Sequence, residues 1–190
     1  MIHAALRFSG LLLVSGAALL GVAIILLSFN PVINQAFSPR LSLLLLLAAI
    51  LLLLSLPGMY ANQASSAGWL GLAGHALLQA GLVLIIVIAA PPLLYPSLRE
   101  ASGESLTAFV LGIALTLGLL LTGIATIQAG VYPRWSGVLL LAATAGFFFV
   151  FFVAEFLPPL AGQAGSATFG LALALALVWI GYSTLTDPAF

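Results

Sequence analysis

The sequence contains no cysteine and no lysine, and only 4% of its 190 residues are charged. The absence of cysteine excludes disulfides, thiolate metal sites and thiol nucleophiles. A soluble domain carries about 25% charged residues, so four basic and four acidic residues could not keep a chain of this size in water. The balanced charges also leave no basic surface for nucleic acid. We therefore expect lipid to surround most of the chain.

Long hydrophobic runs are what the sequence has in abundance, since 64% of its residues are hydrophobic. A membrane span needs about 20 mostly apolar residues, and six segments qualify. The runs are continuous rather than alternating, which predicts helices and not a β-barrel. The predicted spans are Phe8–Phe29, Leu41–Leu56, Gly68–Ala90, Ser105–Ile127, Trp135–Leu157 and Ala167–Thr184.

Prolines are expected to end four of these spans, because proline fixes φ and lacks an N–H group. These stop signals are Asn30-Pro31, Pro57-Gly58, Pro91-Pro92 and Pro158-Pro159. The first run is longer than the usual core of a signal peptide, so we interpret it as a span. Short loops predict antiparallel neighbours. The fold class is therefore an all-α membrane protein, with six transmembrane helices in one domain over residues 1–190.

The arginines do not fix the orientation in the membrane, because Arg7 and Arg134 fall on one predicted side and Arg40 and Arg99 on the other. Arg7 has no acidic neighbour, whereas Arg99 is followed by Glu100. This difference favours cytoplasmic termini.

Three predicted spans open alike, with an aromatic residue, one further residue and then a glycine. The openings read RFSG at 7–10, GWLG at 68–71 and RWSG at 134–137. A second glycine follows each, at Gly21, Gly81 and Gly146. This pattern suggests three tandem helical hairpins whose odd helices share a packing face. The alternative is that small residues and interfacial aromatics are simply frequent in spans.

Polar residues inside the spans are the candidate site. His75 and Gln79 are four residues apart and share one helix face, and Thr122 and Thr144 lie at a comparable predicted depth. We therefore predict an intramembrane polar cluster of His75, Gln79, Thr122 and Thr144. Three roles stay open for His75: an interhelical hydrogen bond, a role for solute or proton, or a cofactor ligand.

Cofactors are permitted but not required by these residues. Haem held by two histidines is disfavoured because the other histidine, His3, precedes the first span. A chlorophyll-type pigment needs one axial imidazole, which His75 could supply, and a quinone is the other candidate. Catalytic motifs are missing: there are no paired aspartates, no His-Glu-x-x-His helix and no phosphate-binding glycine loop. Glu155 is predicted near the opposite interface from His75. We expect no catalytic residues, no metal site and no enzymatic activity.

Two predicted loops, Pro57–Gly68 and Ile127–Gly137, lie on the same side, and each carries a tyrosine, a glutamine and a nearby tryptophan. These residues are Tyr60, Gln63 and Trp69 in one case, and Tyr132, Gln128 and Trp135 in the other. Such residues are typical of a membrane-interface belt. They could equally form a docking surface for a partner.

The same residues carry a resemblance. The pattern Y-x-x-Q-A-x-x-A-G at 60–68, the entry Tyr132–Trp135 and the terminal run Leu171–Leu185 resemble a diffuse group of small six-helix bacterial integral membrane proteins of unknown function. The resemblance implies an all-helical fold and a bacterial inner-membrane location, but no activity. His75 lies outside these motifs.

The function predicted from the sequence is that of a non-catalytic membrane subunit that packs within a larger complex of membrane proteins. The scarcity of charge, the short loops and the lack of a soluble domain favour it. The first alternative is a small-solute transporter or membrane substrate-binding component. The second is a pigment- or quinone-binding subunit that uses His75.

Overall fold

The computed structural model describes residues 2–28, 39–94, 105–152 and 159–186, and in these ranges the chain is helical with no β-strand. The helices are α1 (Ile2–Ser28), α2 (Pro39–Ala89), α3 (Pro91–Leu94), α4 (Ser105–Ala129), α5 (Arg134–Phe152) and α6 (Pro159–Thr186). The predicted all-α class is confirmed for the part of the chain described.

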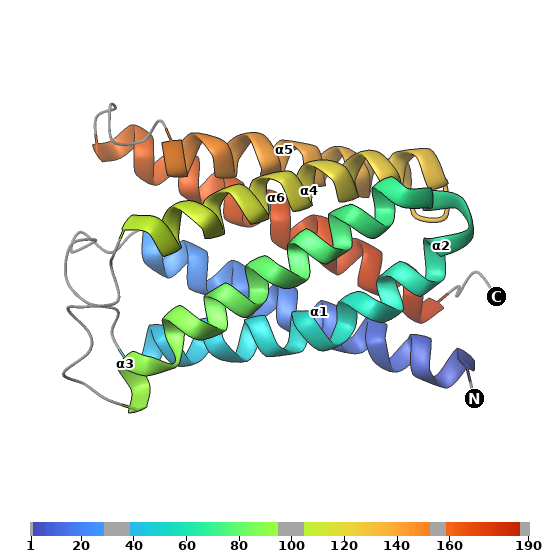
Figure 1. The fold of residues 1–190 in the computed structure, drawn as a ribbon, viewed down its shortest axis with the longest axis horizontal. Coiled ribbons are helices and arrows are strands. Elements are labelled where there is room, and N and C mark those ends of the chain that lie inside the picture. The colour runs from blue at the N-terminus through green and yellow to red at the C-terminus, as the bar shows by residue number, and fades with distance from the viewer. Residues whose placement is uncertain (1, 29–38, 95–104, 153–158, 187–190) are drawn as a thin grey trace.

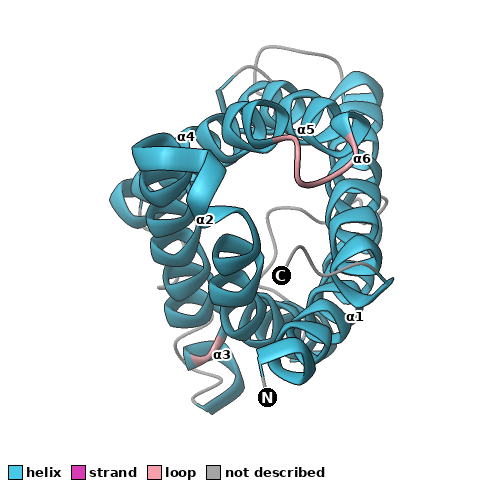
Figure 2. Cartoon of the chain, turned by 90° about the vertical axis from the view of Figure 1, so that its right-hand side faces the viewer, coloured by secondary structure: helices cyan, strands magenta, loops and turns pink. Residues whose placement is uncertain are grey.

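The long helices close into a ring, which Figure 2 shows in a view along the bundle. Helix α1 packs against α2, α2 against α4, α4 against α5, α5 against α6, and α6 against α1. The last contact is close because it is made by glycines: a Cβ atom added at Gly10 would lie 2.8 Å from the carbonyl oxygen of Gly181. The start of α1 and the end of α6 therefore lie at the same end of the bundle (Figure 1).

Helix α2 is a helical hairpin rather than one straight helix. Its 51 residues are divided at Gly68, where φ is 56° and ψ is −155°, a backbone region essentially limited to glycine. The chain folds back there, so that residues 39–67 and 69–89 run in opposite directions between the two ends of the bundle (Figure 1). The first limb contacts α1, where Gly16 meets Leu52, and the second contacts α4, where Gly81 meets Leu115.

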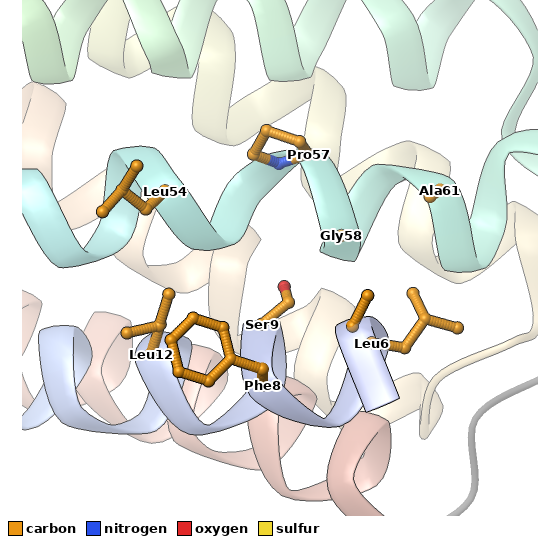
Figure 3. Close-up of a pocket in the computed structure, with 9 residues that line it drawn as sticks. Leu6, Phe8, Ser9, Leu12, Leu54, Pro57, Gly58 and Ala61 are labelled. Atoms are coloured by element: carbon orange, nitrogen blue, oxygen red, sulfur yellow. The ribbon is translucent and has the colours of Figure 1, made fainter. Parts of the chain in front are cut away.

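The predicted stop at Pro57-Gly58 is wrong, and so is the predicted loop over Pro57–Gly68. Helix α2 continues through Pro57 and Gly58 (Figure 3) and reaches the turn at Gly68. Proline removes the hydrogen bond to the carbonyl four residues earlier, that of Leu53, and its ring crowds that carbonyl. Inside a membrane, neighbouring helices help a helix to tolerate such an interruption. Helix α1 packs beside it, where Ser9 Oγ donates to the Ser55 carbonyl oxygen at 2.7 Å. Gly58 permits this approach, because a Cβ atom there would collide with Ser9.

Other predicted boundaries differ less. Helix α1 begins at Ile2 rather than Phe8, α4 ends at Ala129 rather than Ile127, and α6 covers Pro159–Thr186 rather than 167–184. The early start of α6 follows from chemistry, because proline is favoured in the first turn of a helix, where its missing N–H is not needed. The predicted ends at Phe29 and Leu157 lie outside the described residues.

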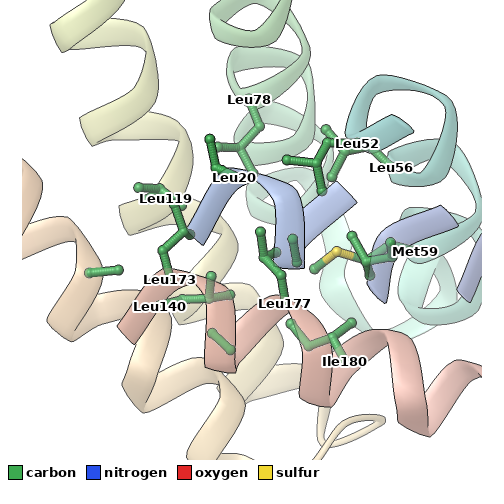
Figure 4. Packing of buried hydrophobic residues seen from close by; sticks show 14 of the residues in the cluster. Leu20, Leu52, Leu56, Met59, Leu78, Leu119, Leu140, Leu173, Leu177 and Ile180 are labelled. Atoms are coloured by element: carbon green, nitrogen blue, oxygen red, sulfur yellow. The ribbon is translucent and has the colours of Figure 1, made fainter. Parts of the chain in front are cut away.

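Leucine, alanine and phenylalanine side chains fill the interior of the ring, and Figure 4 shows several of them converging from α1, α2, α4, α5 and α6. Large apolar side chains also cover the outside, for example Leu54 at 61% and Leu106 at 73% exposure. Within the described residues, four helices are long and apolar enough to cross a membrane. The chain is therefore a multi-pass membrane protein whose outer surface suits lipid.

The three similar openings have the same orientation in the structure. In each, the aromatic side chain points outward: Phe8 is 63%, Trp69 74% and Trp135 67% exposed. The glycine two residues later is buried in all three cases, at Gly10, Gly71 and Gly137. The repeated residues thus repeat a pattern of exposure as well as of sequence.

We expect Gly68→Ala to destabilise the protein through its backbone alone, because nothing lies within 4 Å of a Cβ atom at this position. The strain of a side chain in this region predicts a loss of about 1–3 kcal/mol in the free energy of unfolding. Denaturant unfolding in detergent micelles measures it. Ser66→Ala, at an exposed helical position two residues away, is the control and should change the free energy by less than about 0.5 kcal/mol. Equal values for the two variants would contradict the assigned turn.

Candidate functional site

Buried polar side chains gather at the end of the bundle that holds the Gly68 turn. They come from α2, from α4, from α6 and from the turn between α4 and α5. We call them the polar cluster; its members are Asn62, Gln63, His75, Thr122, Thr126, Tyr132 and Thr184, each with 3% of its surface exposed or less. The hairpin in α2 creates the cluster, because it brings residues before and after Gly68 to the same level.

His75 faces Gln63 across this hairpin. Its Nδ1 atom lies 2.7 Å from the Gly71 carbonyl oxygen, so Nδ1 carries the hydrogen and donates it. The Nε2 atom is then an acceptor, and the amide nitrogen of Gln63 lies 3.5 Å from it. The ring of Tyr60 packs on the imidazole, with a centroid distance of 5.2 Å and an angle of 54°. The neutral imidazole is thus held in one tautomer, with a long, weak contact at Nε2.

Three buried oxygen atoms of the polar cluster have no hydrogen-bond partner: Gln63 Oε1, Thr122 Oγ1 and Thr126 Oγ1. A buried polar atom left unpaired costs about 1–3 kcal/mol. Both threonines lie on α4, and a Cβ atom added at Gly74 would come within 2.7 Å of Thr122 Oγ1. Helices α2 and α4 therefore approach each other closely beside His75. The unpaired oxygen atoms there can still accept hydrogen bonds.

Tyr132 joins the α4–α5 turn to the rest of the cluster. Its hydroxyl donates to the Met59 carbonyl oxygen at 3.1 Å and accepts from the Asn62 amide at 3.3 Å. Thr184 Oγ1 lies 3.4 Å from the phenol oxygen and 2.9 Å from the carbonyl oxygen of Ile180. Burial raises the pKa of the Tyr132 phenol, against the smaller opposing effect of these hydrogen bonds. Tyr132 is therefore a neutral link between α2, α6 and the turn.

The four residues predicted from the sequence as a cluster are placed unequally. Thr122 lies against Gly74, the residue before His75. Gln79 is half-buried, one helical turn beyond His75 on the second limb of α2. Thr144 is buried, and its hydroxyl donates to the Leu140 carbonyl oxygen of its own helix at 2.9 Å. No hydrogen bond between described residues connects Gln79 or Thr144 to His75.

The residues that sequence reasoning missed as cluster members are those assigned to the interface belt. Gln63 is fully buried and Tyr132 only 3% exposed, so these side chains face the interior of the bundle and not the lipid. Trp69 and Trp135 point outward at the same end, as a belt requires. One signal in the sequence could have identified Gln63 as a neighbour of His75. Gln63 lies five residues before Gly68 and His75 lies seven residues after it. A hairpin that turns at Gly68 brings together residues at similar distances from the turn.

The fold and the site together define a multi-pass, all-helical membrane protein with a polar cluster buried at one end. Among the residues described, no group of three or more histidine, aspartate or glutamate side chains gathers as metal ligands would. No family model, curated protein or solved structure matches the chain. The resemblance to small six-helix bacterial membrane proteins stays a prediction.

We expect Tyr132→Phe to lower the free energy of unfolding at neutral pH by about 1–3 kcal/mol, because the change removes the buried hydrogen bonds of the hydroxyl with the Met59 carbonyl and the Asn62 amide. Because burial raises the phenol pKa in the folded state, the unfolded chain loses this proton first as pH rises through about 10. Stability of the parent protein should therefore fall above that pH. The variant should lack this part of the fall.

The chain suits this measurement because it contains no lysine and no cysteine, which would otherwise titrate in the same range. Tyr182→Phe, at a side chain with 61% exposure, is the matched control and should keep the parental pH dependence. The assigned role of Tyr132 fails if the two variants have the same pH profile.

Proposed function

We propose that the chain crosses the membrane six times, with α2 supplying two passes. At 1.5 Å per residue its 51 residues would extend about 77 Å, more than twice the roughly 30 Å of a hydrocarbon core. The reversal at Gly68 supports two antiparallel passes. An even number of passes agrees with the start of α1 and the end of α6 at one end of the bundle (Figure 1).

The six passes form three tandem hairpins in this proposal: α1 with the first limb of α2, the second limb with α4, and α5 with α6. The shared orientation of Phe8, Trp69 and Trp135 supports the repeat.

Arg7 lies near the start of α1 and Arg134 at the start of α5, whereas Arg40 lies at the start of α2, at the opposite end of the bundle (Figure 1). The number of arginines at each end therefore does not fix the orientation. Cytoplasmic termini are proposed because Arg7 has no acidic neighbour, whereas Arg99 is followed by Glu100. The bacterial inner membrane is the location that the sequence resemblance favours.

The proposed function is non-catalytic binding of a small uncharged polar solute, as a transporter or a membrane substrate-binding component. The observation that carries it is the unpaired Oε1 atom of the fully buried Gln63, beside the weakly paired Nε2 of His75. Both atoms are hydrogen-bond acceptors, which a solute with donor groups would satisfy. None of the cluster side chains is an acid, a lysine or an arginine, so a charged solute would find no counter-ion among them.

The other two predicted functions receive less support from the geometry. Scarce charge, short loops and the lack of a soluble domain favoured a role as a subunit of a larger complex. However, Gln63 and Tyr132 are buried within their own bundle and need no partner to cover them. Pigment ligation by His75 would require the Gln63 amide to move away from Nε2 and the ring of Tyr60 to yield space.

Thermal unfolding of the purified protein in detergent, with and without uncharged solutes such as acetamide and glycerol, tests the proposal. A solute that binds only the folded protein should raise its stability by about 2.7 kcal/mol at a hundred times the dissociation constant. Gln63→Leu and His75→Leu should remove the shift. Gln79→Leu, the same change one turn along the helix, should retain it.

Loss of the shift in Gln79→Leu but not in Gln63→Leu would move the site to the cluster predicted from sequence. An absorbing pigment that His75→Leu bleaches, or co-purification with other chains in fixed proportion by native mass spectrometry, would replace the proposed function by one of the other two.

A further inference from the structure

A groove lies between α1 and the first limb of α2, away from the polar cluster. Its volume is about 480 Å³, within the range of about 300–1,000 Å³ typical of ligand sites. We call it the α1–α2 groove; Figure 3 shows its walls, to which Phe8, Ser9, Leu54, Pro57, Gly58 and Ala61 contribute.

The groove follows from how the two helices meet. At its floor, Ser9 Oγ donates to the Ser55 carbonyl oxygen, and Gly58 has no side chain to hold α1 away. At its rims, Phe8 and Leu54 extend outward, with 63% and 61% of their surfaces exposed. The helices therefore touch at the floor and leave a recess above it.

The recess opens on the apolar flank of the molecule. Leu47 and Ile50 continue the exposed side of α2 beyond Leu54, and Leu11 follows Phe8 on α1. No residue that lines the groove is charged, and the only polar side chain, that of Ser9, already donates its hydrogen. Because this flank is continuous with the surface that suits lipid, hydrocarbon is the medium that fills the recess.

The size of the groove favours a thin occupant over a helix. The residues that line the recess run only from Ala5 to Leu12 on α1 and from Leu54 to Ala61 on α2, which is about 12 Å along each helix at 1.5 Å per residue. That length is a short contact for a partner helix but accommodates part of an acyl chain. In lipid no hydrophobic effect drives association, so packing decides what stays bound. A flexible chain that fills the recess gains dispersion contacts that an empty recess forfeits.

We propose that the α1–α2 groove holds one acyl chain of a bilayer phospholipid, packed between Phe8 and Leu54 over Pro57 and Gly58. This site is independent of the solute proposed for the polar cluster. The bound lipid covers the segment of α2 where proline interrupts its hydrogen bonds.

Native mass spectrometry of the full chain in mild detergent, delipidated and then supplied with phosphatidylcholine, tests the site. The parent protein should retain one phospholipid per chain. Ala61→Leu and Ala5→Leu, which fill the groove from its two walls, should each lose it. Ala76→Leu, the same change at an exposed position on the second limb of α2, should retain it.

Thermal unfolding of each variant checks that it is folded. Because two different variants fill the groove, the test can still be made if one of them fails to fold. Retention of the phospholipid by both filling variants would overturn the proposal. So would a parent protein that retains none, or a dimer that the filling variants dissociate, because the groove would then be an interface between copies.

Discussion

The reversal of the backbone at Gly68 is the constraint on which the rest of the structure depends. A positive φ with ψ near 180° lets one continuous run of helix become two antiparallel limbs. The first limb then packs on α1 and the second on α4, which closes the ring between the first and last helices. The same reversal sets Gln63 opposite His75 and lays Tyr60 on the imidazole. Fold and candidate site therefore share one origin.

A second constraint comes from the membrane, where backbone and side-chain polar groups must find partners inside the protein. Several hydroxyls do so on their own helix, as Thr144 and Thr184 do with carbonyl oxygens four residues earlier. Ser9 instead donates across to α2 beside Pro57. Against this background of satisfied groups, the Gln63 oxygen stands out together with the hydroxyls of Thr122 and Thr126, because all three are buried without a hydrogen-bond partner.

Much of the fold could be predicted from sequence because apolar runs of about 20 residues have few alternatives to a helix in lipid. The ends of the helices could not, because they depend on neighbours. From the sequence alone, Pro57 predicts the end of a helix. The contact of Ser9 with Gly58, where α1 packs on the uninterrupted helix, becomes known only from the structure. The chain has 19 glycines, and nothing in the sequence marks Gly68 as the one that reverses α2. Without that turn, Gln63 and Tyr132 look like interface residues, whereas His75 and Thr122 could be found from their position inside apolar runs.

Closure of the ring by α1 and α6 has a consequence for how the protein is made. The face of α1 that carries Gly10 and Gly21 is matched to Gly181 and Ala174 of the last helix. During synthesis α1 is made before α6, its partner in this contact. Until then, this glycine-lined face can contact only lipid or other proteins. Closure of the bundle therefore waits for α6, and a chain interrupted before α6 carries an open seam that quality-control proteases of the membrane could recognise.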